Sequence, residues 1–520
     1  MAANLPDFIV NKIFLKDTLE KNGDGFTFTL NNTFAPVVIY NISIESDGGL
    51  IARENIIIIP VGQNGINCDE ISVEQPLPFS INVPYKVQIK HSTLPKTNIT
   101  LFVETRDAGQ AVLFVNLRPK KNWFFPGFKF VMPILFSPSL AATVQIFPEE
   151  IVGEINPFVY GQFIEHLERC IYGGVFSSDG SEIRQDVFDL IKPLQIPILR
   201  YPGGNFASGY HWEDGIGSPS ERVERFDRAW SAAESNKVGT DEYMGLVENL
   251  GSAPFIVVND GSGTPAEAAR WVEYCNAISG VQADRRTKNG HPEPYHVKIW
   301  GIGNEVWGRW QIGTTTAKNY AERLILFSEA MRKADPSIQI VAVGNTIHTD
   351  ADDDPGKMWN EEILQIAGGH IDYLSFHLYQ PDQDGWKDDQ NPIDLYYSVC
   401  AAAYEGERMI NRLGKLLEKE SPSRKIGIAV DEWNLWLTPP KNAGSMHQVN
   451  YPMRDALYCA AMLNVFHRQS RYLSIANFAQ LVNVLPMIMT NDDQTVTTAM
   501  YWPFWMYSLM QKTAIRSSIN

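Results

Sequence analysis

Two glutamates stand where apolar segments of this chain end abruptly. Glu305 closes the stretch WGIGNE, and Glu432 lies in the stretch IAVDEWN. Acidic side chains in such places are costly unless the protein uses them. Cleavage of a glycosidic bond needs two carboxyls. One gives a proton to the leaving oxygen, and the other, ionised and about 5 Å away, attacks the anomeric carbon with retention of configuration. The two motifs therefore indicate retaining glycosidic cleavage.

The residues beside these acids suit the same chemistry. Two carboxylates that lie close together resist joint ionisation, so one proton stays on the pair. Gly301 and Gly303 allow a ligand to approach the backbone closely, and the amide of Asn304 can donate to a sugar hydroxyl. Either acidic motif alone could be an exposed turn. Their joint occurrence at the ends of two predicted strands favours the catalytic interpretation.

The elements that must position these acids alternate between strand and helix from about residue 156 onward. Amphipathic stretches such as 266–278 and 317–334 predict helices between apolar runs. Eight such runs predict strands at 158–163, 198–201, 254–259, 297–303, 338–343, 371–376, 426–430 and 475–478. The pattern predicts an α/β fold, a (β/α)8 TIM barrel. A doubly wound open sheet is the alternative, but the first strand runs into GQFIEH and not into a glycine-rich phosphate loop.

Polar residues follow six of the eight predicted strands. The carboxyl ends of barrel strands meet at one face, where such enzymes place their active sites. The residues are Glu165 and His166 after the first strand, Asn205 after the second, Asn304 and Glu305 after the fourth, His377 and Tyr379 after the sixth, Asp431 and Glu432 after the seventh, and Gln480 and Asn483 after the eighth.

The domain organisation follows from changes in pattern along the chain. Residues 1–141 read as short strands and predict a β-rich accessory domain, a small sandwich, with alternation at 26–30, 38–44 and 85–89 and a buried run at 56–59. The connection is expected at 118–139. The catalytic barrel is expected over 142–485, in which 142–155 is a candidate sandwich strand. Residues 486–520 are expected to begin a C-terminal β-sandwich.

Composition excludes several classes of partner. The net charge of −16 argues against nucleic acid or an anionic membrane. The five cysteines are scattered and contain no CxxC, which disfavours a disulfide framework or a zinc site. The N-terminus has no secretory pattern, and the apolar region 123–144 is broken by prolines, so a cytoplasmic protein is expected. No cofactor and no metal are expected.

Several motifs resemble those of glycoside hydrolase family 51, whose best-known members are α-L-arabinofuranosidases. The likeness covers about 142–503, with its motifs in the family's order. The motifs are GQFIEHLERCIYGG from Gly161, RYPGGNFASGYHWEDGIG from Arg200, RFDRAWSAAESNKVGTDEYM from Arg225, WVEYCN from Trp271, WGIGNEVWGRWQIG from Trp300, VDEWNLW from Val430 and ANFAQLVNVLPMIMT from Ala476.

The resemblance implies a role for each residue of the predicted site. Glu305 corresponds to the acid/base and Glu432 to the nucleophile. The substrate-binding residues implied are Glu165, Asn205, Asn304, His377, Tyr379 and Gln480, with Tyr379 bonded to the nucleophile and His377 near the acid/base. Alternatives remain for two of them: a salt bridge from Glu165 to an arginine such as Arg200, and a purely structural histidine at 377. Trp307, Trp310 and Trp433 are candidates for stacking on sugar or for core packing.

Two departures from the family pattern are visible. Family members usually continue into strands that complete a β-sandwich, whereas this sequence stops at Asn520 soon after YWPF. The β region at 1–141 has no match in the usual layout. An open sheet edge favours assembly, and a homo-oligomer is expected.

The leading hypothesis is the release of terminal α-L-arabinofuranosyl units from arabinose-containing oligosaccharides and polysaccharides. An endo-acting β-glucanase or xylanase of the same family is the second enzyme hypothesis, with 381–394 as a candidate lid or subsite wall. A non-catalytic carbohydrate-binding barrel is the third, and it predicts the loss of one carboxylate. A metal-dependent hydrolase is disfavoured because no His-x-His follows the first strand.

Overall fold

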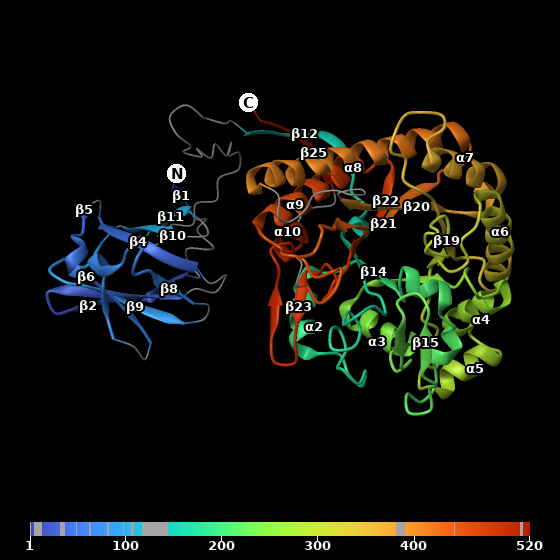
Figure 1. Ribbon diagram of the computed structural model, residues 1–520, viewed down its shortest axis with the longest axis horizontal. Coiled ribbons are helices and arrows are strands. Elements are labelled where there is room, and N and C mark those ends of the chain that lie inside the picture. Colours follow the sequence, from blue (N-terminus) through green and yellow to red (C-terminus); the bar gives the residue numbers. More distant parts are fainter. Residues whose placement is uncertain are drawn as a thin grey trace. The chain divides into compact units, whose positions relative to one another are not determined.

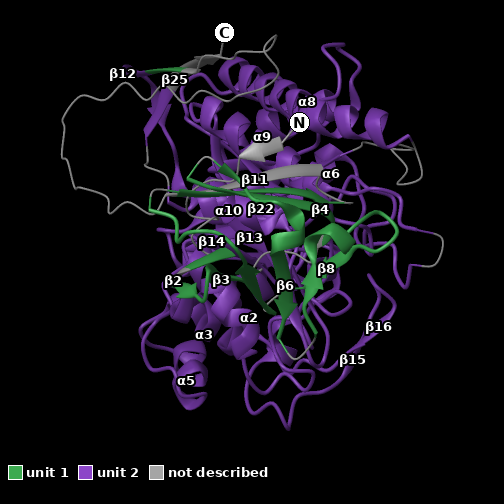
Figure 2. Ribbon diagram, turned by 90° about the vertical axis from the view of Figure 1, so that its left-hand side faces the viewer, with its two compact units in different colours: residues 1–146, 517–520 green, residues 147–516 purple. Residues whose placement is uncertain are grey.

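The computed structural model divides the chain into two compact units (Figure 2), residues 1–146 with 517–520 and residues 147–516. The structure describes residues 2–4, 13–31, 37–47, 49–61, 64–80, 83–96, 98–105, 109–116, 144–380, 391–440, 443–509 and 513–519. The predicted connection at 118–139 and the greater part of the predicted lid at 381–394 lie outside these residues. Among the helices described, none has the length and apolar character that crossing a membrane requires.

The first unit is built from two β-sheets. One sheet has the order β1-β11-β10-β4-β5, with β8 also paired to β4, and the other has the order β2-β3-β9-β6-β7. Their strands are β1 Ala2–Asn4, β2 Phe14–Asn22, β3 Gly25–Asn31, β4 Val37–Ser46, β5 Gly49–Leu50, β6 Ile56–Pro60, β7 Ile66–Asn67, β8 Leu77–Phe79, β9 Pro84–Ile89, β10 Asn98–Thr105 and β11 Gly109–Asn116.

The two sheets share one hydrophobic core, to which β3 contributes Phe26 and Phe28 and β6 contributes Ile56 and Ile58. The four strands predicted at 26–30, 38–44, 56–59 and 85–89 are confirmed as β3, β4, β6 and β9. Buried side chains alternate with less buried ones along β4, β6 and β9, and the first four residues of β3 are all buried.

The second unit contains a closed barrel of eight parallel strands with its helices outside them (Figure 1), so the predicted barrel is confirmed. In barrel order the strands are β13 Gly161–Phe163, β14 Ile198–Tyr201, β17 Ala253–Val258, β18 Ile299–Ile302, β19 Gln339–Val343, β20 Tyr373–Gln380, β21 Gly427–Leu435 and β22 Leu473–Ala479. The barrel interior is packed with apolar side chains from several strands, including Ile198, Phe255 and Ile475.

The helices lie outside the barrel strands (Figure 1), and the longer ones are amphipathic. They are α2 Gln185–Ile191, α3 Thr240–Leu250, α4 Pro265–Asn276, α5 Val281–Lys288, α6 Ala317–Ala334, α7 Pro355–Ala367, α8 Pro392–Glu420, α9 Met453–Arg468 and α10 Tyr501–Tyr507. Side-chain caps begin several of them: Thr316 accepts from the backbone N–H of Asn319 at the start of α6, and Asp354 accepts from that of Lys357 at the start of α7.

Three strand predictions need correction. The first strand was expected at 158–163, but residues Pro157–Tyr160 form a 3-10 turn and only Gly161–Phe163 is strand. The turn is favoured because Pro157 has no N–H to give a ladder and the Asn156 side chain accepts from the N–H of Phe158. The sixth and seventh strands run past their apolar portions, so that β20 contains His377 and β21 contains Glu432.

Short pairs surround the barrel. A hairpin of β15 Arg225–Asp227 and β16 Ala232–Glu234 follows the second strand, β23 Ile488–Thr490 pairs with β24 Thr495–Thr497, and β12 Val144–Glu154 pairs with β25 Thr513–Ile519. The boundary expected at residues 141/142 and the sandwich expected to begin at 486 stay predictions.

A glycine in α7 should prove sensitive to substitution. A Cβ on Gly356 would come 1.8 Å from the backbone oxygen of Thr346, whose hydroxyl donates to the backbone oxygen of His377. We expect Gly356→Ala to lower the free energy of unfolding by about 1–3 kcal/mol, measured by denaturant or thermal unfolding. The matched control is Gly245→Ala in α3, where nothing lies within 4 Å. It should be neutral or stabilising by up to about 1 kcal/mol. Equal effects of both changes would contradict this account.

Candidate active site

The strand ends of the barrel converge on one cavity of about 1180 Å³. It lies where barrel enzymes place their active sites. Seven of the eight predicted site residues line it: Glu165, Asn205, Glu305, His377, Tyr379, Glu432 and Gln480. The eighth, Asn304, is buried beside them and bonds to Asn205.

The carboxylate of Glu432 is held at both of its oxygens. Arg200 Nη1 donates to Oε1 at 2.6 Å, and the Tyr379 hydroxyl donates to Oε2 at 2.7 Å. Burial and the charge of Glu432 raise the pKa of Tyr379 well above its ordinary value, so the phenol keeps its proton and remains a donor. Both bonds favour the ionised carboxylate.

The carboxyl of Glu305 sits on the opposite side of the same cluster. His377 Nδ1 lies 2.7 Å from Oε1, and the indole N–H of Trp310 donates to Oε2 at 3.1 Å. One oxygen of Glu305 and one of Glu432 lie within 4.8 Å of each other, together with a ring nitrogen of His377. This separation matches a retaining pair, for which about 5 Å is required.

His377 shares protons with this pair. Burial opposes its charged form, but the charges of Glu432 and Glu305 raise the pKa of His377 well above its ordinary value. Burial likewise raises the pKa of Glu305, but the charge and hydrogen bond of His377 outweigh it and hold that pKa below its usual range.

Glu165 is a buried acceptor for three donors. Its Oε1 accepts from the backbone N–H of Phe206 and from the indole N–H of Trp230, at 3.1 and 3.0 Å, and its Oε2 accepts from the Gln480 amide at 2.9 Å. Burial and the charge of Glu432 nevertheless raise the pKa of Glu165 to about 7.

Backbone geometry sets the position of Glu305. Gly303 has φ +81°, and a Cβ there would come 3.0 Å from that of Asp260. Glu305 itself has φ +43°, in the left-handed region that side chains other than glycine seldom adopt. This turn directs the acid into the cavity immediately after β18.

Three residues of this site are not among those predicted from the sequence. Arg200 was considered as a partner of Glu165, but its fork bonds Glu432 and Asn304 and lies 3.4 Å from Asp431. The sequence feature that could have identified it is a charged residue inside the otherwise uncharged strand 198–201. The cavity is also lined by Trp230 and Trp436, which stand in quoted motifs but were not selected because one indole looks like another in sequence. Trp433, by contrast, packs in the core against Phe466 and Phe504.

The cluster could also be considered as a metal site. Within the described residues, Glu305, His377 and Glu432 form the single group of metal-ligand type whose atoms converge. The guanidinium of Arg200 lies 2.6 Å from Glu432 and would repel a second cation. The arrangement therefore fits proton transfer and covalent catalysis by two carboxyls better than metal chemistry.

A parallel barrel with two carboxyls of this separation, one just after strand four and one within strand seven, defines a glycoside hydrolase. The comparisons identify the family. Residues 190–393 match the model of the α-L-arabinofuranosidase 1 domain, and residues 431–519 match that of the α-L-arabinofuranosidase C-terminal domain.

Known proteins agree with these matches. The chain is 36% identical to α-L-arabinofuranosidase C of Emericella nidulans, over 71% of this chain and 74% of that protein. It is also 36% identical to an intracellular exo-α-(1→5)-L-arabinofuranosidase of Halalkalibacterium halodurans, over 68% and 72% of the two chains. The crystal structure of the Thermotoga maritima α-L-arabinofuranosidase in complex with arabinose matches with a TM-score of 0.65 and 36% identity, over 73% and 76%. The Thermotoga petrophila structure, a GH51 α-L-arabinofuranosidase, gives the same values. The chain belongs to the α-L-arabinofuranosidases of glycoside hydrolase family 51, and the resemblance noted in the sequence is confirmed.

The raised pKa of Glu165 makes a prediction about stability. The native state holds a proton up to about pH 7, whereas an ordinary glutamate loses it near 4.5. This contribution to the free energy of unfolding is therefore fully present below about pH 4.5 and is lost as the pH rises through about 7. Between about pH 4.5 and 7, the free energy of unfolding should therefore fall by up to about 3 kcal/mol less in the Glu165→Gln variant than in the wild type. Unfolding at a series of pH values measures this difference.

A control separates this effect from general titration. Glu182 is exposed, so Glu182→Gln should give a pH profile parallel to that of the wild type. A parallel profile for Glu165→Gln would show that the carboxyl is not held protonated in the native state.

Proposed function

We propose that this enzyme releases terminal α-L-arabinofuranosyl units by double displacement, with retention of configuration. The observation that carries the proposal is the carboxyl pair Glu305 and Glu432, with oxygens within 4.8 Å in one cavity. The relatives named above support the choice of sugar, because each is an arabinofuranosidase. The substrates proposed are arabinose-containing oligosaccharides and polysaccharides.

Glu432 is the proposed nucleophile. Its two oxygens accept from Arg200 and Tyr379, which stabilise the ionised form that attacks the anomeric carbon. The glycosyl–enzyme ester forms through one Glu432 oxygen as the bond to the leaving oxygen breaks. Water then hydrolyses this ester in the second step.

Glu305 is the proposed acid/base. The proton that the leaving oxygen needs is shared with His377 across the 2.7 Å contact between Nδ1 and Oε1. Proton transfer from His377 to Glu305 across this contact gives the protonated carboxyl that the first step needs. In the second step the Glu305 carboxylate deprotonates water. His377 is thus a substrate-site residue that also regulates the proton on the acid.

The remaining predicted residues are proposed to hold the sugar. The Gln480 amide donates a hydrogen bond to Glu165, and each side chain can still form a further hydrogen bond with a sugar hydroxyl. Asn205 and Asn304 form a second bonded pair, backed by Arg200. A ring of fixed donors and acceptors orients one furanose against Glu432, which lowers the entropic cost of the reaction.

Further properties of the whole protein are also proposed. The relative from Halalkalibacterium halodurans is named intracellular, which supports a cytoplasmic location. We retain the homo-oligomer, the accessory role of residues 1–141 and a β-sandwich beginning at 486 as proposals. Analytical ultracentrifugation of the full chain tests the first, and deletion of residues 1–141 tests the second.

The choice of substrate is tested by a panel of glycosides. We expect 4-nitrophenyl α-L-arabinofuranoside to be cleaved at least a hundredfold faster, in kcat/KM, than the β-xyloside or β-glucoside. The reason is that the donors around Glu165 are fixed by their own bonds and reject a sugar that leaves them unpaired. The cavity exceeds the usual 300–1000 Å³ of a ligand site, so soluble polysaccharides belong in the panel. Activity confined to those polymers would replace the proposal by an endo-acting enzyme.

The two carboxyl roles are tested by alanine variants. Glu432→Ala should abolish turnover, and added azide or formate should restore part of it because a small anion can occupy the space of the nucleophile. Glu305→Ala should lose about a hundredfold or more on natural oligosaccharides, whose leaving group needs a proton. It should lose far less in the first step on 4-nitrophenyl or dinitrophenyl substrates, which burst kinetics report. Equal losses on both substrate types would contradict the acid role, and an absence of anion rescue would contradict the nucleophile.

A further inference from the structure

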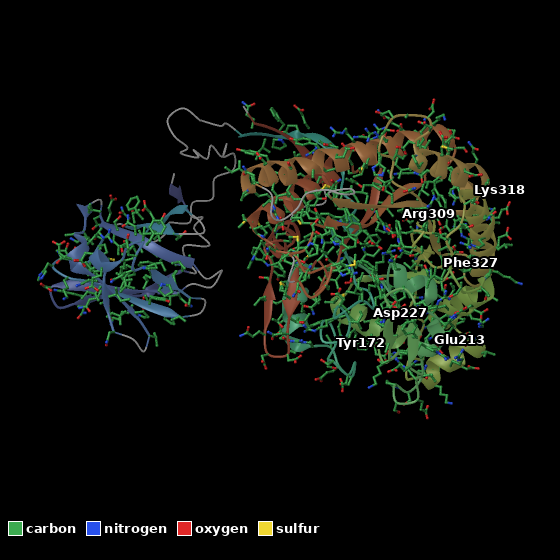
Figure 3. The ribbon with its side chains drawn as sticks, viewed as in Figure 1. Tyr172, Glu213, Asp227, Arg309, Lys318 and Phe327 are labelled. Carbon is green, nitrogen blue, oxygen red and sulfur yellow. The ribbon has the colours of Figure 1, made fainter. Side chains whose placement is uncertain are left out.

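One wall of the cavity is made of three aromatic rings in contact, one from the β15–β16 hairpin and two from the chain that follows β21. The ring of His447 lies 5.1 Å from that of Trp436, tilted by 31°, and 5.8 Å from that of Trp230, edge-on at 78°. All three residues line the cavity. Trp436 follows β21, whereas Trp230 stands between β15 and β16, whose Asp227 is labelled in Figure 3.

Each indole touches a residue of the predicted sugar site. The Trp230 N–H donates to Glu165 Oε1 at 3.0 Å, and the carboxylate of Asp227 accepts from the backbone N–H of Trp230. On the other side, the ring of Trp436 meets that of Tyr379 edge-on at 5.4 Å. The position of the His447 ring therefore bears on Glu165 through one indole and on Tyr379 through the other.

The segment that carries His447 has no regular secondary structure. Residues 443–451 lie outside helix and strand, between β21 and α9, and side-chain hydrogen bonds help to hold them in place. The Trp436 N–H donates to the backbone oxygen of Met446, and the Tyr451 hydroxyl donates to that of His447, each at 3.1 Å.

A carboxylate from the first strand's loop holds the histidine ring. Glu168 Oε1 lies 2.7 Å from His447 Nδ1, and the His447 side chain is 4% exposed. Glu168 adopts φ +49°, a conformation that needs support from its surroundings. Burial raises the pKa of Glu168, but the hydrogen bond and charge of His447, together with a hydrogen bond from Ser445, hold the pKa below its usual range. A charge-assisted bond to a buried ring is among the stronger polar contacts.

We propose that His447, tied by Glu168, is a positioning and specificity-determining residue that fixes Trp230 and Trp436 as the wall against which the terminal sugar binds. The imidazole packs between the two indoles and sets their separation. The contact with Glu168 holds the imidazole and the segment 443–451 against the cavity. Neither residue donates or accepts the proton of the reaction. The inference rests on the proposed function only for the identity of the sugar.

The test replaces Glu168, whose side chain is 33% exposed and whose loss the fold should tolerate. Glu168→Leu removes the acceptor, whereas Glu168→Gln keeps an oxygen that can accept from Nδ1. We expect Glu168→Leu to raise KM about tenfold on the wild-type enzyme's best aryl glycoside, with kcat changed by less than about threefold, because a displaced wall loosens binding of the sugar. Glu168→Gln should recover most of the loss.

A second measurement reports the wall directly. Titration with L-arabinose, followed by tryptophan fluorescence, should show a weaker dissociation constant in Glu168→Leu by a similar factor. His447→Phe keeps a ring but not the bond, and the double variant should be no worse than the worse single one if the two residues act as a unit.

The matched control is Glu267→Leu, which breaks the 2.9 Å contact with His211 Nδ1, at residues that do not line this cavity. It should leave KM unchanged. The inference is overturned if Glu168→Leu leaves KM and arabinose binding unchanged, or if Glu168→Gln is as impaired as Glu168→Leu. Failure of the proposed function would show differently, as a wild-type enzyme whose best substrate is another glycoside, and the KM comparison would still apply to that substrate.

Discussion

The active site depends on the buried ion pairs that the guanidinium of Arg200 makes with Glu432 and Asp431. The Arg200 side chain is 1% exposed and carries the fixed positive charge between Glu432 and Asp431. Burial raises the pKa of Asp431, but the charge of Arg200, together with His377, holds that pKa below its usual range. The planar guanidinium donates to Glu432 from one nitrogen and to Asn304 from another, in a fixed geometry that the flexible ammonium of a lysine does not provide. The charge is placed from strand two, across the barrel from the acids of strands four and seven.

Around this charge the site separates its carboxyls by environment. Glu432 has Arg200 and Tyr379, Glu305 has His377, and Glu165 has only neutral donors besides the nearby charges. The three side chains are chemically identical, yet the pKa of Glu165 is raised to about 7 while that of Glu305 is held low. Different partners thus give chemically identical side chains different pKa values, in keeping with the separate roles proposed for them.

The barrel makes these partnerships possible. Parallel strands register their carboxyl ends at one face, and the register pairs His377 directly with Glu432 across β20 and β21. Loops then bring groups that no strand could supply. The hairpin of β15 and β16 carries Trp230 to Glu165, and the irregular segment 443–451 carries His447 against both indoles. Rigid strands hold the reacting groups, and loops close the wall around them.

The sequence by itself determined the barrel, the carboxyl pair and the family, because these depend on local patterns: apolar runs at regular spacing and acids at strand ends. It also predicted that Glu165, Asn205 and Gln480 would gather at the same face. Only the tertiary structure decided the partners. Arg200 bonds Glu432 and not Glu165, and His447 meets Glu168 across 279 positions. Such contacts depend on side-chain orientation and on the path of the loops, which the spacing of residues along a strand does not determine. The C-terminal ends of β20 and β21 were also not predicted from the sequence, because backbone pairing continues whether side chains are polar or apolar.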